Sequence, residues 1–461
     1  MIADTSFTGK RVCLVGLGVS NLALLDPLLA CGARVSVRDR RAPEALPLSV
    51  GELTARGVRL VCGEGYLDGI DEEVLFRSPG IRPDLPPLAV AVARGAILSD
   101  EMQYFCDRSP AALLCVTGSD GKTTTSSLAA HFLRHAGRDR DTRIALGGNI
   151  GHPLTRELDC LKEADLAVAE LSSFQLMTLS CAPLRACITN ITENHLDWHR
   201  GMAEYTAAKA RILGAGTHAV LNAENTLTAS LARGRDGVTL FSSRRTRGEL
   251  LSTFGPCHTL TAERGALVFD GASLFPLSAI SLPGIHNLEN VMAAVGLTLP
   301  FVDVRALEGA VASFHGVAHR LEHIATVNGV RYYDSSIDST PTRTAAALAA
   351  LGGEPILLCG GRGKGLSYAP LARAVRSRVR ALLLFGEARE EIGRAMQAEG
   401  VSFSSFPTMR EAVMRAKEIA REGDTVLLSP ACTSFDEFRN FEERGDVFRR
   451  LTSDDKNQEE K

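Results

Sequence analysis

The chain contains 461 residues, of which 45% are hydrophobic and 23% are charged, an ordinary composition for a soluble globular protein. At roughly 150 residues per domain, this length predicts about three domains. The formal charge of -3 gives no reason to expect nucleic acid or an anionic membrane as a partner. No apolar run approaches the roughly 20 residues of a membrane helix, and residues 1–10 carry no signal-peptide pattern.

Cysteine usage indicates the redox compartment. The 11 cysteines are scattered singly from Cys13 to Cys432, never as C-x-x-C, and most lie inside apolar runs. Buried free thiols explain this pattern better than disulfides or a zinc site. We therefore expect a cytoplasmic protein.

Short apolar runs that end in glycine alternate with helical stretches, which is the pattern of parallel β-sheets. In the first block a strand over 11–16 is followed by a helix over about 21–31 and a strand over 34–38. Ser109-Pro110 reads as a linker. The first predicted domain is a Rossmann-like domain over 1–109.

Two further blocks follow. The central domain, over 110–314, is predicted to have a mainly parallel sheet, with strands over 111–116, 167–170 and 186–190 and a helix over 287–297. The C-terminal domain, over 315–452, is predicted to be Rossmann-like, with strands over 355–359, 381–385 and 425–429. The polar stretch that begins at Thr452 is expected to fray, giving a disordered tail over 453–461.

The first glycine loop, Gly16-Leu17-Gly18-Val19-Ser20-Asn21, follows a strand and opens a helix, the context of a dinucleotide fingerprint. Asp39 ends the next strand, where an acid that binds a ribose would lie. However, Asn21 stands where the fingerprint has its third glycine. A tight turn without a ligand remains possible, and the loop does not distinguish NAD from a UDP-sugar.

The second loop, Thr117-Gly118-Ser119-Asp120-Gly121-Lys122-Thr123, is more specific. Its backbone amides could surround phosphate oxygens, Lys122 would reach the β- and γ-phosphates, and the Thr123 hydroxyl would bind Mg²⁺. The positive end of the following helix favours an anion. Val116 replaces the first glycine of the usual motif, so a coincidental Gly-Lys-Thr is the alternative.

Candidate partners of this loop lie further along the chain. Glu170 ends an apolar strand, a position from which it could hold Mg²⁺ beside the loop. His195 and His199 have the spacing of a zinc pair, but no suitable glutamate or cysteine accompanies them, so zinc is not expected. Alone, Asn149 reads equally well as a turn residue, His195 as structural and Lys209 as a solvated helix residue.

The order of the motifs strongly resembles that of the ATP-dependent Mur ligases of peptidoglycan synthesis, over nearly the whole chain. The shared runs are T-G-S-D-G-K-T, G-G-N-I-G, E-L-S-S-F-Q-L, T-N-I-T-E-N-H-L-D-W-H, A-A-K-A-R-I, G-I-H-N-L-E-N, H-R-L-E and S-P-A-C-T-S-F-D-E-F. The runs E-L-S-S-F-Q-L and S-P-A-C-x-S-x-D-x-F are typical of the members that use D-glutamate.

The resemblance implies catalytic roles for Lys122, His195, Lys209 and Arg320. It implies ATP contacts, with Arg320 at the γ-phosphate, for Gly118, Ser119, Asp120, Gly121, Lys122, Thr123, Thr124, Asn287, Asn290, Arg320, Asp334 and Ser335. Two Mg²⁺ ions would be held by Thr123, Glu170, His195 and Lys209. Lys209 would be carbamylated, which converts its cation into an anion that positions the second ion.

The resemblance also implies the substrates, UDP-N-acetylmuramoyl-L-alanine and D-glutamate, which a monomer would join through an acyl phosphate. The UDP-substrate residues would be Gly18, Ser20, Asn21, Asp39, Arg41, Ser78, Gly80 and Asn149. The D-glutamate residues would be Ser339, Lys364, Ser434 and Phe441. Lys364 lies in a glycine-rich turn that lacks the Ser or Thr of a second phosphate loop, which favours a carboxylate ligand.

Three positions depart from the family pattern. Asn194 replaces an aspartate, Ser335 or a shifted Asp334 replaces the ribose aspartate, and Ile337 replaces a lysine. The alternatives are a sister ligase or folylpolyglutamate-type enzyme that adds another amino acid, an NAD-dependent dehydrogenase, and an inactive UDP-sugar sensor. The dehydrogenase would leave Lys122, Thr123 and Glu170 without a role, and the sensor would need a broken ATP site.

Overall fold

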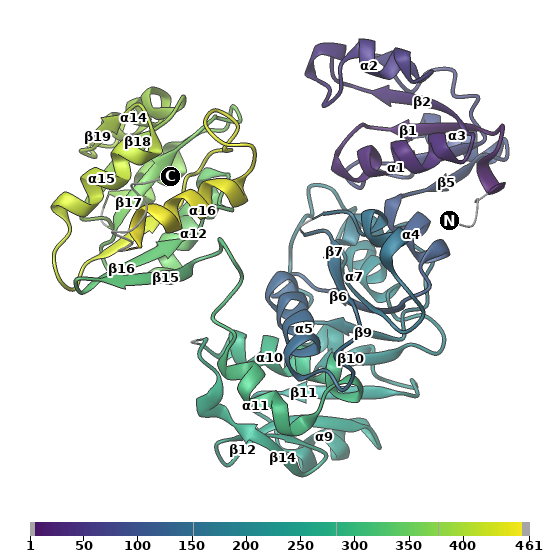
Figure 1. The fold of residues 1–461 in the computed structure, drawn as a ribbon. Coiled ribbons are helices and arrows are strands. Elements are labelled where there is room, and N and C mark those ends of the chain that lie inside the picture. Colours follow the sequence, from purple (N-terminus) through teal and green to yellow (C-terminus); the bar gives the residue numbers. More distant parts are fainter. Residues whose placement is uncertain (1–4, 151, 283, 377, 454–461) are drawn as a thin grey trace. The chain divides into compact units, whose positions relative to one another are not determined.

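The computed structural model describes residues 5–150, 152–282, 284–376 and 378–453 (Figure 1). The chain divides into two compact units, Met1–Phe314 and His315–Lys461. The first unit contains two β-sheets and the second contains one. Parallel strands connected by helices dominate all three sheets, so the predicted α/β fold class is confirmed.

The amino-terminal sheet has the strand order β3-β2-β1-β4-β5, and its neighbouring strands are all parallel. Its strands are β1 (Arg11–Val15), β2 (Arg34–Asp39), β3 (Arg59–Cys62), β4 (Val74–Arg77) and β5 (Ile97–Ser99). Its helices are α1 (Val19–Ala30), α2 (Val50–Ala55), α3 (Pro86–Ala93) and α4 (Glu101–Arg108). The order reverses between β1 and β4, which is where open α/β sheets form a ligand crevice.

The central sheet has the order β14-β13-β12-β11-β10-β9-β6-β8-β7, parallel except for its last two strands, β13 and β14. The strands are β6 (Ala112–Thr117), β7 (Ile144–Gly148), β8 (Leu166–Glu170), β9 (Arg185–Ile188), β10 (His218–Asn222), β11 (Val238–Ser242), β12 (His258–Glu263), β13 (Ala266–Phe269) and β14 (Ala272–Pro276). The helices are α5 (Lys122–Ala136), α6 (Ser173–Leu176), α7 (Met202–Ala210), α8 (Thr226–Ser230), α9 (Arg247–Phe254), α10 (Ile285–Thr298) and α11 (Val304–Ala312).

The sheet of the C-terminal unit has the order β15-β16-β20-β17-β18-β19, in which only β15 is antiparallel to its neighbour. The strands are β15 (Glu322–Val327), β16 (Val330–Asp334), β17 (Ile356–Gly360), β18 (Ala381–Phe385), β19 (Ser404–Phe406) and β20 (Thr425–Leu428). The helices are α12 (Pro341–Leu351), α13 (Ala369–Val375), α14 (Arg389–Ala398), α15 (Met409–Ile419) and α16 (Phe441–Thr452).

One boundary differs from the sequence prediction. Thr452, expected to begin a frayed tail, is the last residue of α16 and is buried, with its hydroxyl donating to the Phe448 carbonyl oxygen at 3.0 Å. A polar residue at a helix end can satisfy its hydroxyl on the preceding turn, which composition does not reveal. The rest of the predicted tail, 454–461, lies outside the described residues.

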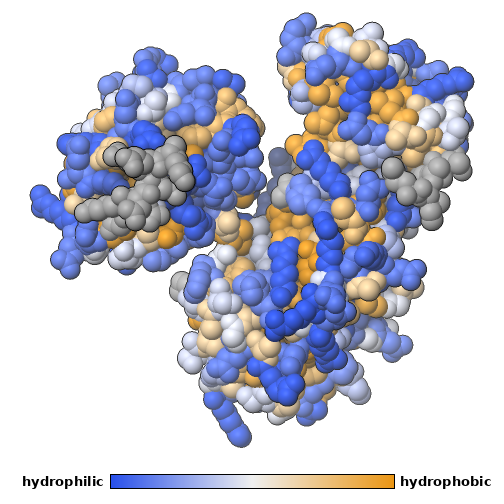
Figure 2. All heavy atoms as spheres, viewed as in Figure 1, coloured by the Kyte–Doolittle hydropathy of each residue, from blue (hydrophilic) through white to orange (hydrophobic). Residues whose placement is uncertain are grey.

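The surface in view is covered mainly by hydrophilic residues with smaller apolar patches between them (Figure 2). The strands that form the cores are buried on both faces, as parallel sheets require. None of the described helices combines the length and apolar character needed to cross a membrane.

Candidate active site

The phosphate loop joins β6 to α5, and two of its glycines have backbone conformations that side chains resist. Gly121 has φ +78° and Gly118 has φ +155°. A Cβ atom at Gly118 would lie 1.9 Å from Thr189 Oγ1, and one at Gly121 would lie 2.2 Å from Asn290 Oδ1. Only glycine permits these close approaches, so the loop is wrapped tightly by the segment after β9 and by α10.

Side chains from other elements fix this loop. Ser119 Oγ and the Tyr205 hydroxyl of α7 share a hydrogen bond of 2.9 Å. Thr189 Oγ1 donates to the Asp120 carbonyl oxygen at 2.6 Å, and the Asp120 N–H donates to Asn190 Oδ1 at 2.9 Å. These contacts therefore help to hold the loop in a defined shape.

Lys122, the first residue of α5, folds back over the loop. Its Nζ donates to the carbonyl oxygens of Gly118 at 3.0 Å and Ser119 at 2.8 Å. Thr123 and Thr124 follow in the first helical turn and are partly buried. The ammonium group therefore lies at the mouth of the loop, where phosphate oxygens bind in loops of this type.

Glu170 is the last residue of β8. It pairs in register with Val116 of β6, which lies directly before the loop. Its side chain is buried. Asn149 Nδ2 donates to Glu170 Oε1 at 2.8 Å, whereas Oε2 has no hydrogen-bond partner among the described residues. An unpaired buried carboxylate oxygen is costly, and a bound cation would satisfy it.

Lys209 lies in α7 and is 1% exposed. Its Nζ donates to the Gly118 carbonyl oxygen at 2.6 Å and lies 4.6 Å from the centre of the Tyr205 ring. Burial, followed by the charge of Lys122, lowers the pKa of Lys209 from 10.5 to about 7. A substantial fraction of this amine is therefore neutral near pH 7, the form that reacts with an electrophile such as CO₂.

His195 lies in a turn beside the two lysines, with φ +53° and its ring 4.9 Å from that of Phe174. Burial and the charges of Lys122 and Lys209 lower its pKa. The second histidine of the apparent zinc pair is occupied, because His199 Nε2 bonds Ser173 Oγ at 2.9 Å and Nδ1 bonds Glu204 at 3.2 Å. The two histidines thus have different surroundings.

The two asparagines of α10 lie against the loop and α5. Thr125 Oγ1 donates to Asn290 Oδ1 at 3.3 Å, and Asn290 Nδ2 donates to Asn287 Oδ1 at 3.3 Å. Of the two residues predicted to contact adenine, Asn290 therefore borders Gly121, and Asn287 is hydrogen-bonded to Asn290.

In the amino-terminal sheet, Asp39 accepts hydrogen bonds from the Leu17 N–H at 2.7 Å and from the Arg41 guanidinium at 2.7 and 3.0 Å. Burial raises the pKa of Asp39, but the hydrogen bonds from Arg41 outweigh it and lower the pKa to about 2. The ionised carboxylate thus fixes Arg41 at the carboxyl edge of the sheet.

Asn21 is completely buried and connects the ends of β1 and β4. Its Nδ2 lies 2.8 Å from the Gly16 carbonyl oxygen and 2.9 Å from that of Phe76. Ser78 Oγ also donates to the Gly16 carbonyl oxygen, at 2.8 Å. The asparagine therefore ties the crevice together where a dinucleotide fingerprint would have glycine. Gly18, the N-cap residue of α1, and Ser20 in its first turn border the same crevice.

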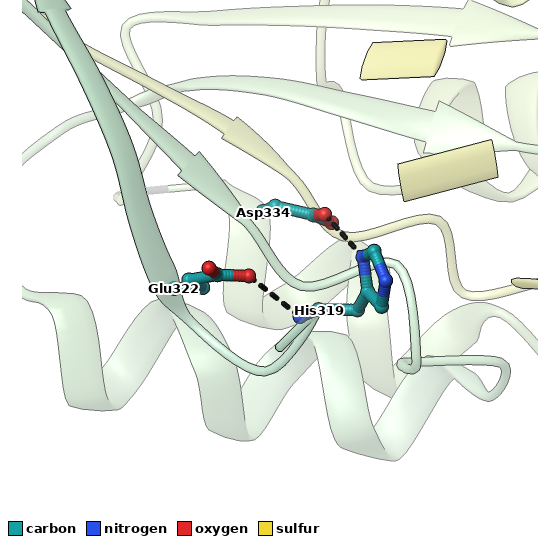
Figure 3. Close-up of side chains that lie close together, drawn as sticks. All are labelled: His319, Glu322 and Asp334. Carbon is teal, nitrogen blue, oxygen red and sulfur yellow. Dashed lines mark hydrogen bonds and ion pairs between the residues drawn. The ribbon is translucent and has the colours of Figure 1, made fainter. Parts of the chain in front are cut away.

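In the C-terminal unit, Arg320 is exposed and lies between two residues in the left-handed region, His319 at φ +60° and Leu321 at φ +46°. His319 itself lies beside Glu322 and Asp334 (Figure 3). His319 Nδ1 lies 2.7 Å from Asp334 Oδ2, and its N–H donates to Glu322 Oε2 at 2.9 Å. Burial opposes protonation of His319, but the hydrogen bond to Asp334 outweighs it and raises its pKa. These contacts offset the strain of the turn.

The predicted ribose contacts, Asp334 and Ser335, are buried and serve this turn. Asp334 bonds His319, and Ser335 Oγ accepts from the Leu321 N–H at 3.1 Å and donates to Asp338 at 2.6 Å. Their polar atoms are therefore engaged within the C-terminal unit, which favours a structural role over the predicted ribose contact.

Two of the predicted D-glutamate residues meet, because Lys364 Nζ donates to Ser339 Oγ at 3.0 Å. Ser434 is buried, and Phe441 begins α16. Sequence reasoning missed Arg444, whose buried guanidinium donates to Ser336 Oγ at 2.9 Å and to the Thr433 carbonyl oxygen at 3.0 Å. Its position one turn after Phe441 was the available signal.

Two family models match this chain, one in each of its two units. The Mur ligase middle domain matches residues 116–298, and the Mur ligase, glutamate ligase domain, matches residues 319–432. A UDP-N-acetylmuramoylalanine–D-glutamate ligase of Symbiobacterium thermophilum is 40% identical over 450 residues, which cover 96% of this chain and 97% of that relative. The chain belongs to the Mur ligase family.

Another relative and a solved structure of the family are also similar to this chain. The relative of the same name from Ruminiclostridium cellulolyticum is 38% identical over 456 residues, covering 96% of each chain. The crystal structure of the UDP-N-acetylmuramate-alanine ligase of Thermotoga maritima covers 96% of this Mur ligase and 98% of its own chain, with 19% identity and a TM-score of 0.52. At that identity the match shows a shared fold.

Within the first unit of this Mur ligase, residues predicted separately from the sequence lie together. Lys122, Glu170, His195 and Lys209 surround the carboxyl ends of β6 and β8. Sequence reasoning missed the residues that hold them, such as Tyr205, Thr189 and Trp198, because each acts through a partner far along the chain. The individual site roles remain predictions.

Proposed function

We propose that this Mur ligase joins D-glutamate to UDP-N-acetylmuramoyl-L-alanine, consuming ATP and releasing ADP and phosphate. The observation that carries the proposal is the convergence of Lys122, Lys209 and the half-paired carboxylate of Glu170 at one phosphate loop. The relatives that match along 96% of the chain are UDP-N-acetylmuramoylalanine–D-glutamate ligases, which supports this choice of substrates.

The reaction would begin when the terminal carboxylate of the sugar nucleotide attacks the γ-phosphorus of ATP, which gives an acyl phosphate and ADP. The neutral amine of D-glutamate would then attack the acyl carbon. Collapse of the tetrahedral intermediate forms the amide and expels phosphate. The contribution of Lys122 is electrostatic, since it neutralises charge that spreads over the transferring group.

The residues of the central sheet fit a magnesium ion. Glu170 Oε2 is a buried, unpaired oxygen, and Thr123 supplies a hydroxyl in the first turn of α5, so both offer the hard oxygen ligands that Mg²⁺ prefers. Mg²⁺ bound there, with ATP, would neutralise phosphate charge and orient the γ-phosphate. His195 would complete the proposed ligand set.

Lys209 is proposed to be carbamylated. Its low pKa supplies a neutral amine, which combines with CO₂ to give a carbamate and a proton. The product would replace a buried cation, which has no ion-pair partner among the described residues, by an anion able to hold a second Mg²⁺.

The remaining roles rest on the resemblance. Asp39, Arg41, Ser78, Gly80 and Asn149 are proposed for the sugar nucleotide. Asn287, Asn290 and Arg320 are proposed for ATP, and Ser339, Lys364, Ser434 and Phe441 for D-glutamate. The proposed domains are 1–109, 110–314 and 315–452, in a cytoplasmic monomer.

The test is phosphate release from ATP with UDP-N-acetylmuramoyl-L-alanine and one amino acid at a time. We expect D-glutamate to give the highest rate, well above L-glutamate, L-lysine and L-alanine. A higher rate with another amino acid would assign the chain to a sister activity, and no rate with any of them would contradict the proposal.

A further inference from the structure

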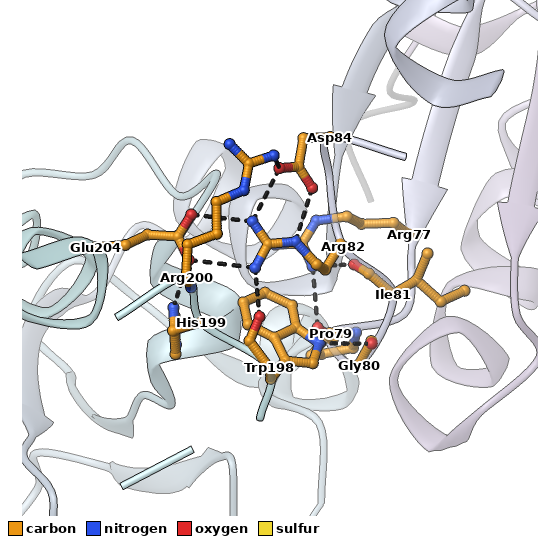
Figure 4. A network of polar contacts seen from close by, with 10 residues as sticks. All are labelled: Arg77, Pro79, Gly80, Ile81, Arg82, Asp84, Trp198, His199, Arg200 and Glu204. Atoms are coloured by element: carbon orange, nitrogen blue, oxygen red, sulfur yellow. Dashed lines mark hydrogen bonds and ion pairs between the residues drawn. The ribbon is translucent and has the colours of Figure 1, made fainter. Parts of the chain in front are cut away.

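The segment from Ser78 to Asp84, between β4 and α3, is held by two arginines that reach the central sheet's helices and loops (Figure 4). Arg77 is completely buried, and its Nη1 donates to the carbonyl oxygens of Pro79 at 3.1 Å and Ile81 at 3.0 Å. Its Nη2 donates to the Phe174 carbonyl oxygen of α6 at 2.7 Å. This arginine fixes the first half of the segment.

Arg82 fixes the second half and is the centre of the network (Figure 4). Its guanidinium forms a fork with Asp84, with both hydrogen bonds at 2.8 Å. It also donates to Glu204 Oε1 at 2.9 Å and to the Trp198 carbonyl oxygen, and it lies 4.8 Å from the centre of the Trp198 ring. The arginine thus uses its charge, its fork geometry and its planar face together.

Two of the partners of Arg82, Glu204 and Trp198, border the proposed site of the chemistry. Glu204 lies in the first turn of α7, the helix that carries Lys209. Trp198 follows His195 within the same turn, and its Nε1 donates to the Gly80 carbonyl oxygen at 3.0 Å. The Ser78–Asp84 segment and the proposed metal turn are therefore joined through Arg82, through the Trp198–Gly80 hydrogen bond and through the contact of Arg200 with Asp84.

The carboxylates of Glu204 and Asp84 stay ionised across the physiological pH range. The hydrogen bonds from Arg82 are the main cause that lowers the pKa of Glu204 to about 2, and they likewise lower that of Asp84 to about 2. Glu204 Oε2 also accepts from the Arg200 N–H at 2.9 Å, so one carboxylate organises the end of the His195 turn and the start of α7. Protonation therefore does not break the connection near neutral pH.

We propose that Arg82 is a positioning residue of the ligase reaction, which couples sugar-nucleotide binding at the Ser78–Gly80 segment to Mg²⁺ binding beside His195 and Lys209. The inference rests on the proposed function. Binding of either ligand would order one side of the shared contact and lower the cost of ordering the other side, which is a positive coupling free energy between two sites.

The coupling can be measured by calorimetric titration of UDP-N-acetylmuramoyl-L-alanine into the full chain, with a non-hydrolysable ATP analogue present, with and without Mg²⁺. We expect Mg²⁺ to lower the wild-type Kd for the sugar nucleotide by a factor of about 5 or more, which is a typical size of coupling between two sites. In Arg82→Ala the two Kd values should approach each other. Arg82→Lys, which keeps the charge but loses the fork, should give a ratio of the two Kd values between those of the wild type and Arg82→Ala.

Arg305→Ala is the matched control. Arg305 makes the same kind of fork, onto Asp303 at 3.2 and 3.1 Å, but its side chain is 91% exposed in α11. This variant should retain the wild-type Kd ratio. If Arg82→Ala does not fold, Glu204→Gln replaces it, since it removes the acceptor's charge and should also reduce the ratio.

The outcomes separate the two proposals. An inactive wild-type enzyme with D-glutamate would overturn the proposed function. An active wild-type enzyme with no Mg²⁺ effect on Kd, or a folded Arg82→Ala that keeps the full ratio, would overturn the positioning role alone. A merely structural role would lower the melting temperature without changing the Kd ratio.

Discussion

Asn149 donates a hydrogen bond to only one carboxylate oxygen of Glu170, and the other oxygen is buried without a partner among the described residues. The asparagine therefore orients the carboxylate and leaves one oxygen available. Mutation of a partner that orients a metal ligand in this way typically costs about 10- to 100-fold in metal affinity or activity. This pair is the sharpest indication of a cation site in the first unit.

Glu170→Gln should raise the Mg²⁺ concentration needed for half-maximal phosphate release by about 10- to 100-fold, because the amide lacks the charge of the carboxylate. The measurement is a Mg²⁺ titration of the rate. Glu157→Gln is a suitable control, since Glu157 pairs with Arg143 at 2.7 Å and has no predicted role in the site. An unchanged Mg²⁺ requirement would contradict the metal assignment of Glu170.

Lys209→Ala should nearly abolish ligase activity, with a rate at least about 10²-fold lower, because both the buried amine and its carbamate are removed. Bicarbonate should not restore the variant, whereas formate, which supplies a free carboxylate, should restore part of the rate. The exposed Lys162→Ala serves as the control. A wild-type rate in Lys209→Ala would remove the basis for the carbamate.

The depressed pKa of Lys209 also predicts a pH dependence of stability. The unfolded chain keeps this proton up to about pH 10.5, while the folded chain releases it near 7, so the unfolded state binds more protons between these values. In CO₂-free buffer the wild-type free energy of unfolding should rise with pH across this window. Lys209→Met should reduce that slope by up to about 1.4 kcal/mol per pH unit.

Chemical denaturation at several pH values measures this slope. Equal slopes for the wild type and Lys209→Met would show that the amine titrates normally in the folded chain. Ionisable groups distant from Lys209 contribute equally to the two slopes, so their contributions cancel in the comparison.

The sequence predicted those parts of the site that follow from one rule of parallel sheets. Glu170 ends an apolar strand, and the phosphate loop follows another. The sequence therefore predicted that they lie close together, because the carboxyl ends of neighbouring parallel strands share an edge of the sheet. It did not predict Asn21 as a tie between β1 and β4, or Arg82 as a partner of Glu204. Those contacts join residues far apart in the chain, and nothing local in the sequence specifies them.

The same limit applies to backbone conformation. His319 and Leu321 occupy the left-handed region although neither is glycine. Their conformation is imposed by contacts with Asp334, Glu322 and Ser335, so local propensity gives no warning of it. The antiparallel strands β13 and β14 were also not predicted, since short edge strands carry a weak periodic signal.

The turn around Arg320 yields a prediction of non-additivity. Arg320→Ala should slow phosphoryl transfer by about 10²-fold or more, and His319→Ala should reproduce part of this loss because the turn would relax. The double variant should be no slower than Arg320→Ala alone, since His319 acts through the arginine. Single-turnover measurement of acyl phosphate formation tests this, and additive losses would show that His319 has a separate role.

Lys122 donates to two carbonyl oxygens of its own loop. A phosphate oxygen that binds this ammonium therefore shares it with the two carbonyl oxygens or replaces them. The net affinity for ATP then includes the cost of losing those two carbonyl contacts. Small anions that do not compensate for this loss should be poor inhibitors of ATP binding. Those two contacts therefore set the threshold that an anion has to exceed at this lysine.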